Sequence, residues 1–198
     1  MHLRGLMCAG LCLMLSGSVA GLAQENGANA QKPFTPTAVA PADSLNAALS
    51  TFEAEFVGAA DAMPAEKYDF APATSIGLYT GVRTFAEQVK HVTQANYSLM
   101  RSFGISGAPD LKAIDALKTK DDIVKALKDS FTYMHSAIGT ITPENAFLSV
   151  PGPAQYKLTR ASVAAYAMGH LMDHYGQMVE YLRMNGIVPP ASQQSGSK

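Results

Sequence analysis

Two histidines, His170 and His174, are four residues apart within residues 160–185, RASVAAYAMGHLMDHYGQMVEYLRMN. Apolar residues recur through this stretch at spacings of three and four, which predicts an amphipathic helix. Side chains at positions i and i+4 project from the same helix face, so both rings would lie on the face that a bundle buries. A buried imidazole needs a partner for each ring nitrogen. A shared metal ion would meet that need, because neutral imidazole is the commonest metal ligand. Hydrogen bonds to hydroxyl groups or water in an ordinary core would meet it as well.

Two further histidines lie in other parts of the chain that have helical periodicity. His91 falls in residues 82–103, one position off the apolar stripe, and His135 lies at a similar stripe edge between Phe131 and Ile138. Either ring could turn toward the pair at His170 and His174, or remain on the surface. The spacing alone does not choose between them.

Four long helices must position these side chains. Apolar residues at helical spacing predict them over residues 43–63, 82–103, 119–141 and 160–185, with Asp43 and Thr119 as N-terminal caps. One turn of helix is expected near residues 111–117 and a short helix after Thr142. No alternation typical of strands competes with this pattern. The predicted fold is therefore all-α, a four-helix bundle.

The N-terminal segment has the layout of a secretory signal peptide. Arg4 precedes an apolar run over residues 6–15, small residues follow, and cleavage is expected after Ala23. Because both cysteines, Cys8 and Cys12, lie in this segment, the mature chain would have none. That excludes disulfides, thiolate nucleophiles, zinc ribbons and c-type haem attachment. We expect a periplasmic or secreted protein with no membrane segment after cleavage.

The remaining chain is expected to contain one domain, over residues 43–190. A flexible linker over residues 24–42 and a disordered tail over residues 191–198 would flank it, because both are rich in small and polar residues without periodicity. The whole chain has a formal net charge of −1 and no basic run. This balance argues against a nucleic-acid partner and against binding to an anionic membrane surface.

Three runs of the sequence, MPAEKYDFAPA, VRTFAEQVKHVTQANY and GHLMDHYGQMVEYLRMNGIVPP, resemble the DinB-like family of metal-binding four-helix bundles. The resemblance covers roughly residues 43–190. It implies that His91, His170 and His174 bind one divalent metal, and the family pattern has no ligand at the position of His135. Related bundles commonly form homodimers, so the resemblance implies a homodimer here too. The chain departs from the family in having no tryptophan and a long loop over residues 71–81.

Three neutral nitrogen ligands leave at least one coordination position open, which is typical of catalytic rather than structural zinc sites. Zinc, nickel or iron would suit the same ligands. One hypothesis is a metal-dependent enzyme acting on an unknown small molecule, either a hydrolase or a transferase using a small thiol, as the resemblance implies. The alternative is a non-enzymatic metal-binding or stress-associated protein. A b-type haem bundle and a di-iron site are weaker hypotheses, because His170 and His174 are i,i+4 neighbours and Glu-x-x-His pairs are missing.

Several residues within about a turn of a predicted ligand are candidates for shaping its surroundings. Glu87 could accept a hydrogen bond from a ligand ring or simply lie in solvent. The other candidates are Asn96, Tyr97, Tyr166 and Asp173.

Overall fold

The computed structural model describes residues 35–194. Four long helices dominate this part of the chain: α1 (Pro41–Ala62), α2 (Phe85–Met100), α4 (Lys120–Ile138) and α5 (Arg160–Met184). Two short helices, α3 (Leu111–Asp115) and α6 (Pro190–Gln194), complete it. Within residues 35–194 the only β-type pairing is an isolated bridge between Ser149 and Thr159. The predicted all-α fold is confirmed.

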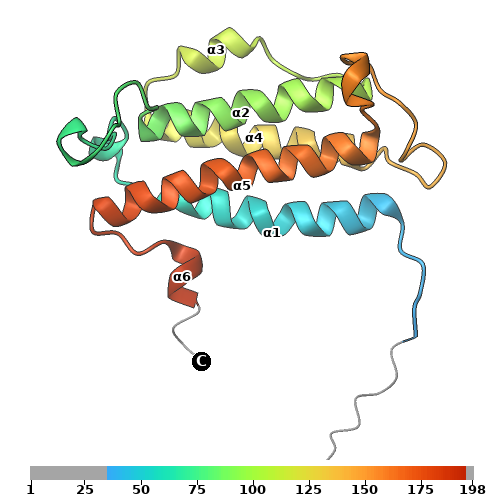
Figure 1. Cartoon of the computed structure of the whole chain (residues 1–198), viewed down its shortest axis with the longest axis horizontal. Coiled ribbons are helices and arrows are strands. Elements are labelled where there is room, and N and C mark those ends of the chain that lie inside the picture. Colours follow the sequence, from blue (N-terminus) through green and yellow to red (C-terminus); the bar gives the residue numbers. More distant parts are fainter. Residues whose placement is uncertain (1–34, 195–198) are drawn as a thin grey trace, which may run out of the picture. The chain divides into compact units, whose positions relative to one another are not determined.

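The long helices form a bundle in which α2 packs against α4 and α5, and α1 packs against the same two helices. Figure 1 shows α5 between α2 and α1, with α4 behind them. The largest fully buried side chains come from all four helices, and examples are Phe56, Phe85, Phe131 and Leu171. This arrangement places one face of α2 directly beside one face of α5, which brings the histidines of both helices within reach of one another.

Threonine caps fix the start of three of these helices. Thr84 and Thr159 each form a reciprocal capping box with the third residue of the helix that follows, and Thr119 accepts from the backbone N–H of Asp122. The prediction of Thr119 as a cap is confirmed. Helix α2 was expected to begin near residue 82 and begins at Phe85, because the side chains of Thr84 and Glu87 satisfy its first N–H groups there.

The first residue of helix α1 also differs from expectation. Helix α1 begins at Pro41 instead of Asp43, so residues 41 and 42 belong to the helix and not to the linker. Proline suits the first helical position because its fixed φ matches the helix and its missing N–H would have had no partner. The predicted signal peptide and most of the predicted linker lie outside the described residues.

The connecting segments close the ends of the bundle. The Tyr68 ring packs edge-on against Phe85 with ring centroids 5.2 Å apart, and Phe70 packs similarly on Tyr181 at 5.6 Å. After Thr142 the chain makes turns instead of the expected short helix, because the Asn145 side chain accepts from the Thr142 N–H and donates to the Thr140 carbonyl.

The C-terminal prediction needs correction where the structure describes it. Residues 190–194 form the short helix α6, although residues 191–198 were expected to be disordered. The side chain of Pro190 lies close to Gly58, where a Cβ atom would be 3.7 Å from it, so α6 lies against α1. Within residues 35–194, no helix is both long and apolar enough to cross a membrane.

Candidate metal centre

His91 of α2 and the pair His170 and His174 of α5 converge where these two helices meet. Each ring offers a nitrogen, and the three nitrogens lie within 4.8 Å of one another. The ring centroids are 4.6–5.2 Å apart. The structure therefore brings together the three residues predicted as ligands. We call them the histidine cluster.

The spacing within the histidine cluster suits a shared ion. The Nε2 atoms of His91 and His170 are 3.2 Å apart. Two nitrogens bound to one zinc ion at about 2.0–2.1 Å in tetrahedral geometry would be about 3.3 Å apart. Among residues 35–194, no second group of three or more potential ligands converges in this way. The cluster contains imidazole rings only, which makes it a neutral, nitrogen-only ligand set.

The surroundings of the histidine cluster keep the rings neutral. Burial lowers the pKa of His91, and repulsion of a protonated His91 ring by Arg83, and by His170 when that ring is also protonated, lowers it further. Burial also lowers the pKa of His170, although Asp173 opposes this effect. For His174, burial and the two other rings lower the pKa to about 4. Unprotonated rings at neutral pH offer the lone pairs that a metal needs.

A chain of hydrogen bonds orients the most buried of these rings. Gln88 of α2, only 1% exposed, places its Oε1 atom 2.6 Å from His174 Nδ1. Its Nε2 donates to Gln177 Oε1 at 2.8 Å, and Gln177 Nε2 donates to Asp173 Oδ2 at 3.4 Å. Because a carboxylate only accepts, the chain runs in one direction and His174 Nδ1 carries the proton. The unprotonated Nε2 of His174 is then the nitrogen available to a metal.

Sequence reasoning missed Gln88 and Gln177. A signal for both was present, because Gln88 lies three residues before His91 and Gln177 three residues after His174, each on the same helix face as its histidine. Glu87 was the residue considered as a partner for a ligand ring. Instead, its Oε2 accepts from the Thr84 N–H at 2.8 Å and caps α2.

The other candidates divide between core and surface. Asn96 donates to Ser130 Oγ within the core, and the ring of Tyr97 packs on Tyr133, so both face α4 and not the histidine cluster. Tyr166 is 63% exposed, with its ring centroid 6.4 Å from that of His170. Asp173 ends the hydrogen-bond chain described above.

His135 lies apart from the histidine cluster and joins α4 to α1. Its Nδ1 is 2.8 Å from Asn46 Oδ1, and its Nε2 is 2.9 Å from Glu53 Oε2. Both ring nitrogens therefore have partners on a different helix.

Two cavities open beside the histidine cluster and share His91 and Gln94. One, of about 740 Å³, is predominantly polar and is lined by Arg83, Glu87, Lys90, Asp115 and Lys118 among others. The other, of about 430 Å³, is predominantly apolar and includes Leu99, Leu111, Tyr166 and His170 in its lining. We call them the polar cavity and the apolar cavity. Both cavities therefore reach the histidine cluster at His91.

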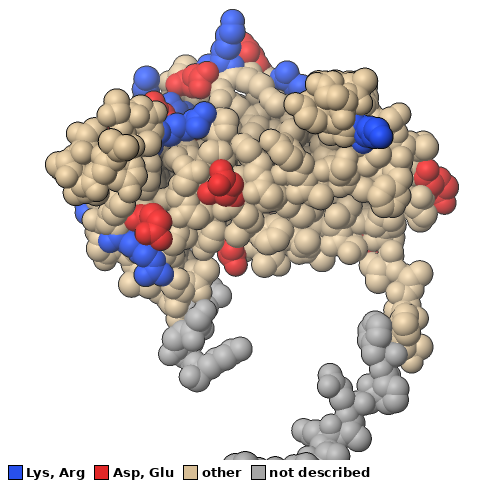
Figure 2. Space-filling model, viewed as in Figure 1, with Lys and Arg blue, Asp and Glu red and all other residues tan. Residues whose placement is uncertain are grey.

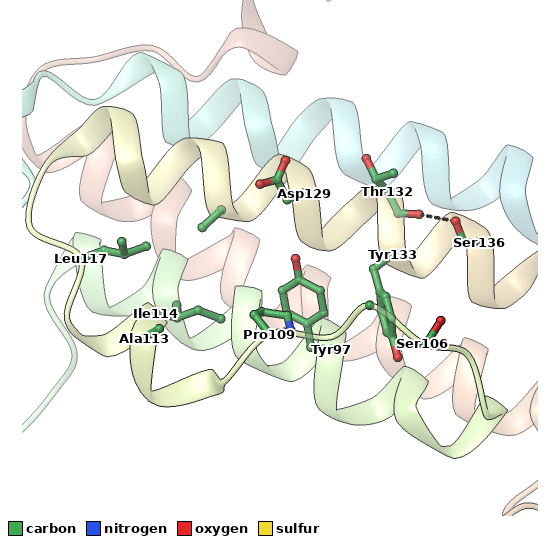
Figure 3. A pocket seen from close by; sticks show the side chains of 12 residues that line it. Tyr97, Ser106, Pro109, Ala113, Ile114, Leu117, Asp129, Thr132, Tyr133 and Ser136 are labelled. Atoms are coloured by element: carbon green, nitrogen blue, oxygen red, sulfur yellow. Dashed lines mark hydrogen bonds between the residues drawn. The ribbon is translucent and has the colours of Figure 1, made fainter.

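A third cavity, of about 550 Å³, lies between α4 and the segment that contains α3. Figure 3 shows Tyr97 and Tyr133 side by side in it, with Asp129 and Thr132 on the α4 side. None of the histidines lines this cavity. Within residues 35–194, potential metal ligands converge at the histidine cluster and not in this cavity, which leaves the cluster as the better candidate for metal chemistry.

Comparison with known families agrees with the placement of the candidate site at the histidine cluster. The family model described as the DinB superfamily matches residues 48–178, a range that covers most of the helical bundle and all three residues of the histidine cluster. A comparison with curated proteins gave no significant match. The match extends over more than half of the sequence, and the chain belongs to the DinB superfamily.

Proposed function

We propose that His91, His170 and His174 together bind one divalent transition metal ion, and that the chain uses this ion in a metal-dependent reaction on a small molecule. The observation that carries the proposal is the convergence of three neutral imidazole nitrogens within 4.8 Å of one another. Zinc, nickel and iron all suit a set of nitrogen ligands.

A bound ion would supply Lewis acidity and would lower the pKa of a water molecule or thiol at its open position. The protein's own contribution is to keep the site ready. The amide of Gln88 holds the His174 ring in one tautomer, and burial keeps all three rings unprotonated. The polar and apolar cavities both include His91 in their lining, so each gives a reactant access to this ring. Hydrolysis and transfer to a small thiol are the two reaction types that we propose for such a site.

The alternative proposal is a non-enzymatic protein that stores or senses the ion. The histidine cluster favours neither by itself, but the two adjoining cavities favour an enzyme, because ion storage alone needs no space for a second molecule. Assays against hydrolase and thiol-transferase substrates, repeated after chelation, separate the two proposals. Turnover that chelation abolishes supports the enzyme; metal binding without turnover across the panel supports storage or sensing.

Metal analysis of the purified protein by mass spectrometry tests the binding proposal directly. We expect close to one zinc, nickel or iron ion per chain, either as purified or after incubation with each metal. A chain that retains none of the three after incubation would contradict the proposal.

We also propose that the chain is exported by its N-terminal segment and acts as a homodimer in the periplasm or outside the cell. The layout of residues 1–23 supports export, and membership of the family supports the dimer. Cell fractionation and light scattering at micromolar concentration test these two points. A cytosolic location, or the mass of a single chain, would contradict them.

A further inference from the structure

The polar cavity carries more positive than negative charge beside a set of neutral rings. Three basic residues line it, Arg83, Lys90 and Lys118, against two acidic ones, Glu87 and Asp115. The whole chain, in contrast, has a net charge of −1. Figure 2 shows Lys and Arg side chains gathered, with a few acidic ones, near the start of α2 and beside α3, whereas the surface over the rest of α2 and α5 carries few charges.

The two carboxylates of the polar cavity already accept hydrogen bonds from the protein. Glu87 Oε2 accepts from the Thr84 N–H at 2.8 Å, and Asp115 Oδ1 accepts from Gln94 Nε2 at 2.9 Å. The Lys90 ammonium donates to the Asp115 carbonyl at 3.2 Å. Across residues 35–194, the three ion pairs include none of these basic residues. The side chains of Arg83 and Lys118 therefore have donors available to a ligand.

The charge of Arg83 reaches the histidine cluster. Arg83 and His91 line the same polar cavity, so the guanidinium carries its charge beside the histidine cluster. A divalent ion held only by neutral rings would keep both of its positive charges and add them to this side of the molecule. The combined field favours an anionic reactant over a neutral or cationic one.

We propose that the site takes a small organic anion whose carboxylate or phosphate group binds Arg83 and Lys118 and whose apolar part lies in the apolar cavity against Leu99, Leu111 and Tyr166. The planar guanidinium of Arg83 can hold either anionic group through two parallel hydrogen bonds. Because His91 lines both cavities, a molecule that spans them passes the histidine cluster. The placement of the reacting atoms at the histidine cluster rests on the metal site proposed above. The contacts of the anionic group with Arg83 and Lys118 do not rest on it.

Calorimetry with three related probes tests this class of reactant. Phenyl phosphate has both the anionic and the apolar part, inorganic phosphate has only the first, and phenol has only the second. We expect phenyl phosphate to bind the zinc-loaded protein more tightly than either of the others. Chelated protein should bind it more weakly but still measurably, because Arg83 and Lys118 remain.

Single substitutions then identify the contacts. Arg83→Gln and Lys118→Gln should each weaken the binding of phenyl phosphate about fivefold, the upper size for a solvent-exposed charged contact. Lys112→Gln is the matched control, since it removes the same charge from an exposed lysine of α3 that lines neither cavity, and it should leave the affinity unchanged. The zinc affinity of Arg83→Gln should be unchanged or higher, because a positive charge near the rings is lost.

The outcomes separate this inference from the metal proposal. Zinc binding with an affinity for phenyl phosphate that neither Arg83→Gln nor Lys118→Gln changes would overturn the anion site and leave the metal site standing. Failure to bind zinc, with phenyl phosphate still held through Arg83 and Lys118, would overturn the metal site and support the anion site. Residue 83 also contributes to the fold, because its backbone carbonyl accepts a hydrogen bond from the Tyr181 hydroxyl. Lys118→Gln provides the second variant if Arg83→Gln disturbs the fold.

Discussion

The histidine cluster and His135 show how the same side chain lies in two different environments in one bundle. Each ring of the cluster faces other rings, with no carboxylate among the converging groups. His135 instead lies between Asn46 and Glu53, and both of its nitrogens have partners within 2.9 Å. A ring whose nitrogens are both engaged by the protein has no lone pair left for an ion. A ring that faces two other neutral rings has one.

The difference teaches that helix packing, not local sequence, decides which histidine can bind a metal. His91 and His135 both lie at the edge of an apolar stripe. His91 is on α2 at the side that contacts α5, whereas His135 is on α4 and turns to α1. The five predictions that follow test this distinction, from the largest expected effect to the smallest.

Replacing one residue of the histidine cluster should abolish tight metal binding. His174→Ala removes the most buried ring and leaves two nitrogens, so we expect metal affinity to fall by more than about 100-fold, beyond the loss typical of an outer-shell residue. His135→Ala is the matched control and should keep its ion. Titration with a chromophoric zinc chelator measures both. Loss of the ion in His135→Ala but not in His91→Ala would mean that the third ligand is assigned wrongly.

Removing the metal should lower the melting temperature without unfolding the protein. The core contains large buried side chains from all four long helices, while the candidate ligands come from α2 and α5 alone. An ion that binds only the native state adds about 3–4 kcal/mol at a hundred- to thousand-fold excess over Kd, which corresponds to about 10 °C for a domain of this size. Circular dichroism with and without chelator measures the shift. Loss of helix at room temperature on chelation would instead make the site structural.

Replacing Gln88 should weaken metal binding by less than removal of a ligand does. Gln88→Leu has a similar size but no acceptor for His174 Nδ1, so the ring is no longer held in the tautomer that presents Nε2. Loss of such a partner typically costs 10- to 100-fold in metal affinity.

The nitrogen NMR shifts of His174 provide a readout of the tautomer that a purely structural role of Gln88 would not change. Gln94→Leu is a suitable control, because Gln94 lies on the same helix and its Nε2 donates to the segment containing α3 instead of a ring. An unchanged tautomer and unchanged affinity in Gln88→Leu would contradict the positioning role.

The stability of the metal-free protein should fall as the pH drops below about 6.5. In the folded state the pKa of each cluster histidine is lowered, to about 4 for His174, whereas the unfolded chain titrates near 6.5. The unfolded state therefore binds more protons between these values, and acidification favours it. Thermal melts of chelated protein from pH 7.5 to pH 4.5 test the direction. His174→Gln should flatten the pH dependence of the stability. His135→Gln should leave the contribution of the cluster histidines to that pH dependence unchanged.

Much of this fold could be predicted from the sequence, because it depends on local patterns. The threonine cap at Thr119 and the i,i+4 pair at His170 and His174 both follow from helix geometry alone. The capping box at Thr84 and Glu87 also involves residues within one turn, although the helix was expected to start three residues earlier, near residue 82. Local rules sufficed because each of these features involves residues within one turn.

What could not be predicted depends on contacts between distant segments. Gln88 bonds to His174 and Gln177, which follow it by 86 and 89 residues, and only the packing of α2 on α5 brings them together. The role of His135 likewise depends on Asn46 and Glu53 of α1, more than 80 residues earlier. The choice of His91 as the third residue of the cluster came from the family resemblance, because helical phase alone treated His91 and His135 alike.

The smallest effect is expected at His135, where the interaction affects stability alone. The side chains of His135 and Glu53 are 28% and 29% exposed, so their contact is partly screened by water. Pairs of this kind contribute about 0.2–1 kcal/mol, and His135→Gln should lower the free energy of unfolding by that amount while leaving the metal content unchanged. Glu53→Gln should have an effect of similar size, and the double variant should lose less than the sum, because both single changes break one contact. Urea titration measures these differences. Additive losses would show that the two residues act independently, and a change in metal content would remove the distinction between His135 and the histidine cluster.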